Sequence, residues 1–152
     1  MRLNDKTLLE IVNSIPLVSI DLVMRNTAGE VLLGKRVNRP AKGNWFVPGG
    51  RIRKNELILD SINRISEAEL GISLTSGPPR FLGVFEHIYD DNFLGEAGVN
   101  THYVVLAYEC QIEDDARLEL DSQHSETKWW SVNELLNNPD VHKYVKAYFR
   151  ET

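Results

Sequence analysis

The chain has 152 residues, 42% hydrophobic and 26% charged, which are ordinary values for one soluble globular domain spanning residues 1–152. The formal net charge of −5 does not favour nucleic-acid binding, and no apolar run approaches the roughly 20 residues of a membrane helix. The single cysteine, Cys110, excludes an internal disulfide, and the N-terminus has no signal-peptide core, so we expect a cytoplasmic protein.

Taken in chain order, the hydrophobic pattern predicts strands interspersed with helices. Residues 4–14 have helical spacing, with Asn4 or Asp5 as the N-cap. Residues 17–24 alternate as a strand, and a turn at residues 26–29 leads into a returning strand at residues 30–36. Further strands are predicted at residues 45–47, 81–89, 101–112 and 128–130, and further helices at residues 56–70, after Ser131 and at residues 141–149. This order predicts an α+β fold in which helices sandwich a mixed β-sheet.

Two features of the first third of the chain concern charge. In the strand at residues 17–24, Ser19, Asp21 and Val23 share one face. Residues 35–54 contain seven basic residues, Arg36 and Arg51 among them, and no Asp or Glu. A local positive field on an acidic protein suits a compact anion such as a diphosphate, and an ordinary solvated basic loop explains the stretch equally well.

Residues 50–72 read GRIRKNELILDSINRISEAELGI and carry glycines, acids and an arginine at a recognisable spacing. The spacing is that of the Nudix box, G-x5-E-x7-R-E-U-x-E-E-x-G-U with U apolar. Ile65 and Ala68 stand where the box has glutamates, and Ser66 stands where it has an apolar residue. The positions that match are Gly50, Glu56, Arg64, Glu69, Gly71 and Ile72. An amphipathic helix after a glycine turn is the alternative, but the full spacing favours a Nudix-type fold.

The helix predicted at residues 56–70, with Asn55 as N-cap and Gly71 as its end, carries positions 65, 68 and 69 on one face. Only Glu69 can ligate a metal there. Mg²⁺ is coordinated by about six oxygens, commonly one or two of them from carboxylates. One glutamate is therefore enough for a single ion that also binds substrate phosphates. The missing acids predict a change in the metal count, in the source of the base, or in the bond that breaks.

The glycine turn before this helix supplies backbone groups for the same anion. The Gly49 and Gly50 carbonyls can reach a metal, and their N–H groups can approach phosphate. Arg51 follows directly and could bind phosphate oxygens in bidentate fashion. Arg64 could do the same, or it could pair with Glu56 or Glu69.

With two glutamates replaced, a general base must come from elsewhere, and the chain offers four histidines. His102, inside a strand, and His142, on the last helix, are expected to be structural or solvated. His87 ends a strand beside a polar loop and could bind substrate. His124, expected in a polar loop, has a suitable pKa for a base, although spacing alone favours a role outside catalysis.

Beyond the box, the chain resembles the GDP-mannose mannosyl hydrolases, a divergent Nudix branch with the Nudix fold, from about residue 16 to residue 149. The stretches PLVSIDLV, LLGKRVNRPAKGNWFVPGGR, HIYDDNF and THYVVL and the pair Gln123-His124 carry the resemblance. It implies Mg²⁺-dependent (or Mn²⁺-dependent) hydrolysis of GDP-mannose, and of GDP-glucose, to GDP and free hexose, by water attacking the sugar C1 with inversion. It also implies a homodimer with the N-terminal region at the interface.

Site residues follow from the same resemblance. It implies one ion held by the Gly49 carbonyl, Glu69 and Gln123, and His124 as general base. Arg36 and Arg51 would neutralise charge on the departing GDP. Asp21, His87 and Tyr103 match positions that contact the sugar or diphosphate, although Asp21 and Tyr103 could make purely structural hydrogen bonds. Thr127 stands where the family has an aromatic residue near the substrate, which leaves the choice between mannose and glucose open. A Nudix pyrophosphohydrolase that cleaves a P–O bond and a nucleotide-sensing module without catalysis remain alternatives.

Overall fold

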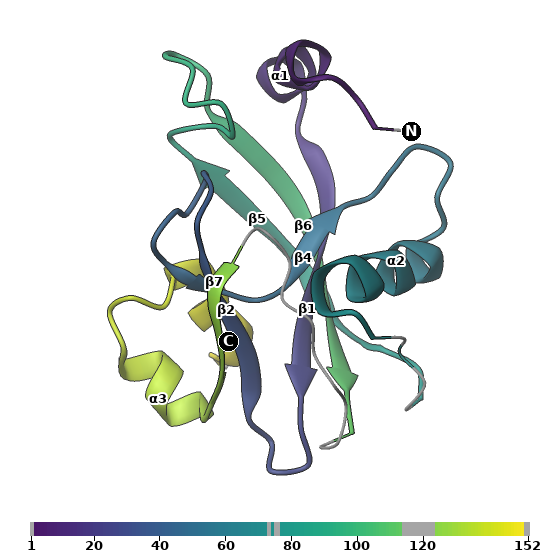
Figure 1. The fold of residues 1–152 in the computed structure, drawn as a ribbon, viewed down its shortest axis with the longest axis vertical. Coiled ribbons are helices and arrows are strands. Elements are labelled where there is room, and N and C mark those ends of the chain that lie inside the picture. The colour runs from purple at the N-terminus through teal and green to yellow at the C-terminus, as the bar shows by residue number, and fades with distance from the viewer. Residues whose placement is uncertain (1, 73, 75–76, 114–123, 151–152) are drawn as a thin grey trace.

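A computed structural model describes residues 2–72, 74, 77–113 and 124–150 of the chain. In chain order the elements are α1 (Asp5–Ser14), β1 (Leu17–Arg25), β2 (Val31–Arg36), β3 (Trp45–Phe46), β4 (Gly49–Arg51), α2 (Ile58–Leu70), β5 (Arg80–Tyr89), β6 (Thr101–Gln111), β7 (His124–Trp130), α3 (Val132–Asn137), α4 (Lys143–Lys146) and the 3₁₀ helix η1 (Ala147–Phe149). Figure 1 shows α2 beside β1 and β4, and α3 beside β2 and β7. The described helices include none long and apolar enough to cross a membrane.

The strands form one mixed sheet in the order β3-β2-β1-β6-β5, with β4 paired to β1 and β7 paired to β2. β1 and β6 run parallel along their whole lengths, while the other pairs are antiparallel. β1 meets β2 only where Arg25 faces Val31, and its first half pairs with the glycine strand β4 instead. The sheet therefore diverges between β1 and the far end of β2, where Arg36 lies.

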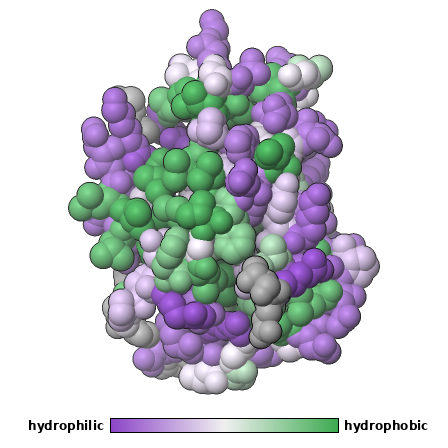
Figure 2. Space-filling view, turned by 180° about the vertical axis from the view of Figure 1, so that it is seen from behind, coloured by the Kyte–Doolittle hydropathy of each residue, from purple (hydrophilic) through white to green (hydrophobic). Residues whose placement is uncertain are grey.

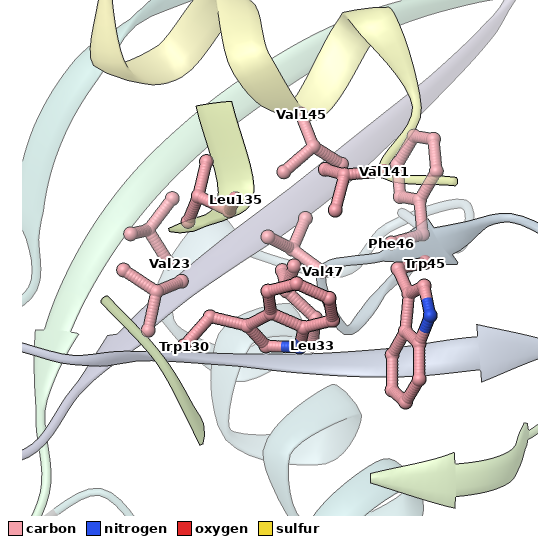
Figure 3. Close-up of a cluster of buried hydrophobic side chains, with 10 residues drawn as sticks. Val23, Leu33, Trp45, Phe46, Val47, Trp130, Leu135, Val141 and Val145 are labelled. Atoms are coloured by element: carbon pink, nitrogen blue, oxygen red, sulfur yellow. The ribbon is translucent and has the colours of Figure 1, made fainter. Parts of the chain in front are cut away.

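Two apolar cores lie on the two faces of β1, as the alternation of its side chains predicts. Ile20, Leu22 and Met24 face α2 and pack with Ile62 and Ile65. The opposite face packs against the C-terminal helices through the cluster in Figure 3, which consists of Val23, Val31, Leu33, Trp45, Phe46, Val47, Trp130, Leu135, Val141 and Val145. The predicted fold class, a mixed sheet sandwiched by helices, is confirmed.

Several helix ends carry the predicted caps. The Asn4 side chain accepts a hydrogen bond of 2.8 Å from the Thr7 backbone N–H at the start of α1. Ser131 accepts one of 3.1 Å from the Glu134 N–H at the start of α3. Gly71 ends α2 in the left-handed conformation, at φ 69°.

The start of α2 differs from the prediction. The helix begins at Ile58 with Leu57 as N-cap, and Asn55 lies outside it at φ 67°. Within the part of the chain that the structure describes, no side chain caps this helix start; the Glu56 carboxylate instead holds the preceding turn, accepting bonds from the Arg53 N–H at 3.0 Å and the Ser61 hydroxyl at 2.6 Å.

Three further elements differ from the prediction. β4 is a strand rather than only a turn, because its backbone pairs with β1. The helix predicted at residues 141–149 is split into α4 and η1, and His142 precedes it as an N-cap whose Nδ1 accepts a bond from the Tyr144 N–H at 3.1 Å. β7 begins at His124, so this residue starts a strand and does not lie in a loop.

Candidate active site

A cavity of about 200 Å³ opens where β1 diverges from β2. Seven of its lining residues are ones that the sequence nominates: Asp21, Arg36, Gly49, Gly50, Arg51, His87 and Tyr103. They come from β1, β2, β4, β5 and β6, so five strands contribute to one site. Such convergence of polar side chains from several strands on one cavity is typical of a binding site for a small molecule.

Asp21 lies at the back of this cavity and is 6% exposed. Burial raises its pKa to about 7, while a hydrogen bond from the Tyr148 hydroxyl and the charge of Arg36 act in the opposite direction. The same hydroxyl lies 3.2 Å from His87 Nε2. Asp21, Tyr148 and His87 therefore form a chain of polar groups inside an otherwise aromatic wall.

His87 is held by aromatic rings on several sides. Its ring stacks on Tyr144 at 4.3 Å and 3° between planes, and it meets Phe46 edge-on at 5.9 Å. Burial, followed by the nearby His142, lowers the pKa of His87 to about 4, so the imidazole is neutral at physiological pH. The predicted substrate-binding histidine thus lies in the cavity as a neutral group.

Two arginines give the opposite wall of the cavity its positive charge. Arg36 Nε donates to the Pro40 carbonyl at 2.9 Å, which fixes the guanidinium at the end of β2. Burial raises the pKa of Tyr103, and the charges of Arg36 and Arg51 both oppose this rise. The two guanidinium groups therefore act on the same phenol. An anion that enters the cavity meets both charges.

The glycine strand β4 lies too close to its neighbours for side chains. A Cβ on Gly49 would lie 2.5 Å from Asp21 Oδ1 and 2.6 Å from the Ile20 carbonyl oxygen. A Cβ on Gly50 would lie 3.2 Å from Ile65 Cγ1. Glycine at these positions brings the bare backbone up to both Asp21 and α2.

The helix face that carries glutamates in the Nudix box is largely apolar here. Ile65 is 1% exposed and belongs to the apolar core, while Ala68 faces solvent. Glu69 is half-buried, with its Oε2 shielded from solvent, one helical turn beyond Ile65. A carboxylate and the backbone carbonyl of Gly49 are hard oxygen donors, so they suit Mg²⁺ completed by waters and phosphates. Within the described ranges no group of three or more His, Cys, Asp or Glu could hold a metal.

Arg64 lies outside the described lining of the cavity. Its guanidinium forms a bidentate ion pair with Glu56, at 2.7 and 2.9 Å, and donates to the Arg51 carbonyl at 2.8 Å. Its hydrogen bonds to Glu56 are the largest cause that lowers the pKa of this carboxyl to about 2. Of the two roles that the sequence leaves open for Arg64, the structure supplies the pairing with Glu56, and its bond to the Arg51 carbonyl ties α2 to β4.

The pair Gln123-His124 is only partly covered by the structure. Gln123, expected to ligate the metal, lies outside the described residues, and the description of His124 is limited to its backbone. That backbone pairs with Arg36 across the β2–β7 ladder. The candidate base therefore begins a strand directly opposite a residue that lines the cavity.

Sequence reasoning missed three other aromatic residues of the site, Phe46, Tyr89 and Tyr148. Tyr89 and Phe46 line the cavity, and Tyr148 bonds to Asp21 across a separation of 127 residues. The only signal for Tyr148 in the sequence is its place on the apolar stripe of the last helix, which predicts packing and says nothing about the hydroxyl.

Comparison with known proteins identifies the class of the fold. The model of the Nudix domain matches residues 16–150, and the chain belongs to the Nudix family. The fold is also that of the MutT Nudix hydrolase from Burkholderia pseudomallei, with a TM-score of 0.72, 24% identity and coverage of 89% of this chain and 96% of that one. The Nudix domain of Shewanella oneidensis NrtR, complexed with ADP ribose, matches with a TM-score of 0.66 at 19% identity, over 97% of each chain.

A curated relative has much higher sequence identity. The chain is 44% identical over 137 residues to the low-salt glycan biosynthesis protein Agl8 of Haloferax volcanii, which covers 90% of this chain and 85% of the relative. Family and fold together make this protein a Nudix hydrolase that acts on a nucleotide-linked substrate.

Proposed function

We propose that the protein hydrolyses a GDP-linked hexose, GDP-mannose and also GDP-glucose, to GDP and the free sugar. Water attacks the sugar C1 with inversion, so the C–O bond breaks and the diphosphate leaves intact. The observation that carries this proposal is the apolar helix face opposite the glycine strand, where Ile65 packs against Gly50. A site that attacks phosphorus needs its acids there, and a site that attacks the sugar does not.

The face of α2 that carries Ile65 retains one acid, Glu69, so we propose a requirement for one metal ion. One Mg²⁺, or Mn²⁺, would be held by the Gly49 carbonyl and Glu69, with Gln123 as a further ligand. Such an ion supplies Lewis-acid stabilisation of the diphosphate and makes GDP a better leaving group. Arg36 and Arg51 add fixed positive charge on the cavity wall, where charge builds as GDP departs.

The remaining roles belong to the polar groups of the cavity. Asp21, His87 and Tyr103 bind the sugar and the adjoining diphosphate, and His124 removes the proton from the attacking water. In an oxocarbenium-like transition state the leaving group carries most of the charge, so electrostatic contacts make the largest contribution. The printed name of Agl8 places that relative in glycan biosynthesis, which is consistent with a sugar nucleotide as substrate here.

Heavy-oxygen water tests the bond that breaks. The enzyme is incubated with a panel of nucleotide sugars and Mg²⁺ in H₂¹⁸O, and the products are analysed by mass spectrometry. We expect label in the released hexose and unlabelled GDP. Label in a phosphate would overturn the proposal and would favour pyrophosphohydrolysis, the chemistry that the preserved positions Gly50, Glu56 and Glu69 otherwise suggest. Absence of turnover across the panel would exclude both.

We further propose that the protein is a homodimer that associates through the sheet face opposite the cavity. Figure 2 shows hydrophobic side chains gathered over part of one face of the molecule. Val84 and Ile88 alternate along β5 with residues that point toward the cavity side, and they are 59% and 50% exposed. Ile15 at the end of α1 and Val18 on β1 are also exposed. Light scattering should give twice the chain mass, and Val84→Glu should shift it to the monomer.

A further inference from the structure

We propose that Tyr148 is a positioning residue of the candidate active site, whose hydroxyl holds the Asp21 carboxylate and the His87 imidazole in place on the cavity wall. The C-terminal 3₁₀ helix η1 thereby contributes the Tyr148 hydroxyl to a site whose lining residues come from the strands. This inference rests on the proposed function for its activity readout only.

The geometry places the Tyr148 hydroxyl between two groups that line the cavity. It donates a hydrogen bond to Asp21 Oδ2 and lies 3.2 Å from His87 Nε2. Tyr148 is not itself among the described lining residues, so it reaches a bound molecule through Asp21 and His87. Its ring meets Phe85 edge-on at 4.7 Å, which fixes the phenol independently of its hydrogen bonds.

The number of hydrogens in this chain of three groups fixes the tautomer of His87. While Asp21 is ionised, the Tyr148 hydroxyl gives its one hydrogen to the Asp21 carboxylate, so the hydroxyl oxygen can only accept from His87. His87 Nε2 must then carry the hydrogen, and Nδ1 must be bare. Burial keeps the pKa of the ring low, at about 4, so the imidazole does not carry both hydrogens at neutral pH. Tyr148 thus determines which nitrogen of His87 can donate.

Tyr144 provides a matched comparison four residues earlier on the same C-terminal segment. Its hydroxyl also makes two hydrogen bonds, accepting from the Ile88 N–H at 3.0 Å and donating to the Ile88 carbonyl at 2.8 Å. Its ring stacks on His87 just as that of Tyr148 packs on Phe85. Both hydroxyls bind the segment to the sheet, and of the two only that of Tyr148 bonds to side chains that line the cavity.

The experiment compares Tyr148→Phe with Tyr144→Phe, each of which removes one hydroxyl and keeps the ring. Turnover of GDP-mannose is measured, folding is checked by circular dichroism, and ¹⁵N spectra report the His87 tautomer, with the His87→Gln variant for assignment. We expect kcat to fall roughly 10- to 100-fold in Tyr148→Phe, the size of one hydrogen bond to a charged group, and by less than about 3-fold in Tyr144→Phe. At a pH well above 7, where Asp21 is ionised, His87 should be the Nε2–H tautomer in the wild type and in Tyr144→Phe, and a mixture in Tyr148→Phe.

Equal losses of kcat in the two variants would reduce Tyr148 to a structural residue and overturn the proposal. An Nδ1–H tautomer of His87 in the wild-type protein, or an unchanged Nε2–H tautomer in Tyr148→Phe, would overturn it as well. The wild-type spectrum decides even when a variant does not fold. If the wild type turns over no GDP-sugar, the proposed function fails, while the spectra still decide the role of Tyr148.

Discussion

Two carboxyl groups, one beside α2 and one in the cavity on the other side of β1, have opposite surroundings. Glu56, beside α2, receives hydrogen bonds from Arg64, Ser61 and the Arg53 backbone, and its pKa falls to about 2. Asp21, in the cavity, is enclosed with fewer donors, and burial raises its pKa to about 7. The charged form of Glu56 is thus stabilised by its hydrogen-bond donors. The charged form of Asp21 is destabilised by burial, so this carboxyl binds a proton more readily than usual.

This difference separates two functions within one domain. On the α2 side Glu56 and Arg64 of the box bind one another and stabilise the fold. On the cavity side charged groups remain available to a ligand. Changes at Glu56 or Arg64 should therefore alter stability with little effect on turnover, and changes in the cavity should do the reverse.

The largest effect is expected on the cavity side, for His124→Gln. Loss of His124, the proposed general base, should lower turnover of GDP-mannose by about 10²–10⁴-fold with a small change in stability. His102→Gln, on the neighbouring strand β6, is the control and should change turnover by less than about 3-fold, because its side chain alternates away from the cavity-lining Tyr103. A near-wild-type rate in His124→Gln would remove this residue from the role.

Next in size is Arg64→Met on the α2 side. Breaking a fully buried ion pair costs about 3–5 kcal/mol, and we expect about 1–3 kcal/mol in the free energy of unfolding here, because the two side chains keep some exposure. The exposed fractions are 27% for Arg64 and 15% for Glu56. Denaturant unfolding measures the loss. A KM for the GDP-sugar that rises at unchanged stability would instead assign Arg64 to substrate binding.

The pH dependence of stability should have opposite signs at the two carboxyls. Because the folded pKa of Glu56 is lowered from 4.5 to about 2, its contribution is present above pH 4.5 and is lost as the pH falls from there toward 2. Because the folded pKa of Asp21 is raised from 3.8 to about 7, its contribution is present below pH 3.8 and is lost as the pH rises toward 7. Unfolding of Glu56→Gln and Asp21→Asn against the wild type, at several pH values, measures both slopes. Slopes of the same sign would contradict the comparison.

The smallest expected effect concerns Cys110, which lies in the core beside α2. Burial, followed by the charge of Glu109, raises its pKa to about 12, so the thiol stays protonated and reacts slowly with an alkylating reagent. Arg64→Met should speed this labelling by loosening the α2 side, while Tyr148→Phe should leave it unchanged. Equal acceleration in both variants would show that the two sides open together.

Local sequence signals predicted most of the fold. Alternation placed Ser19 and Asp21 on one face of β1, and capping residues such as Asn4 and Ser131 fixed helix starts, because these features depend on neighbours a few residues away. The strand character of β4 was missed because its pairing with β1 leaves no apolar pattern in the sequence Gly-Gly-Arg. Pairing across the sheet is decided by the whole fold.

The candidate site, too, was predicted only where a signal is local in the sequence. Charged and glycine residues near the box drew attention to Arg36, Gly49 and Arg51, and family resemblance added Asp21 and Tyr103. Tyr148 escaped notice because a tyrosine on an amphipathic helix predicts packing, and its partners lie on strands far away in sequence. Which hydroxyl faces a carboxylate depends on how the last helix docks.

The two hydrogen bonds of the Tyr144 hydroxyl also bear on self-association. β5 is the last strand in the order of the sheet, and an edge strand with bare N–H and carbonyl groups is a template on which another chain can polymerise. Tyr144 occupies both groups of Ile88 at 3.0 and 2.8 Å. A side chain from the end of the chain thus blocks the growth of an aggregate at this point of the sheet, where β5 carries the exposed apolar residues Val84 and Ile88.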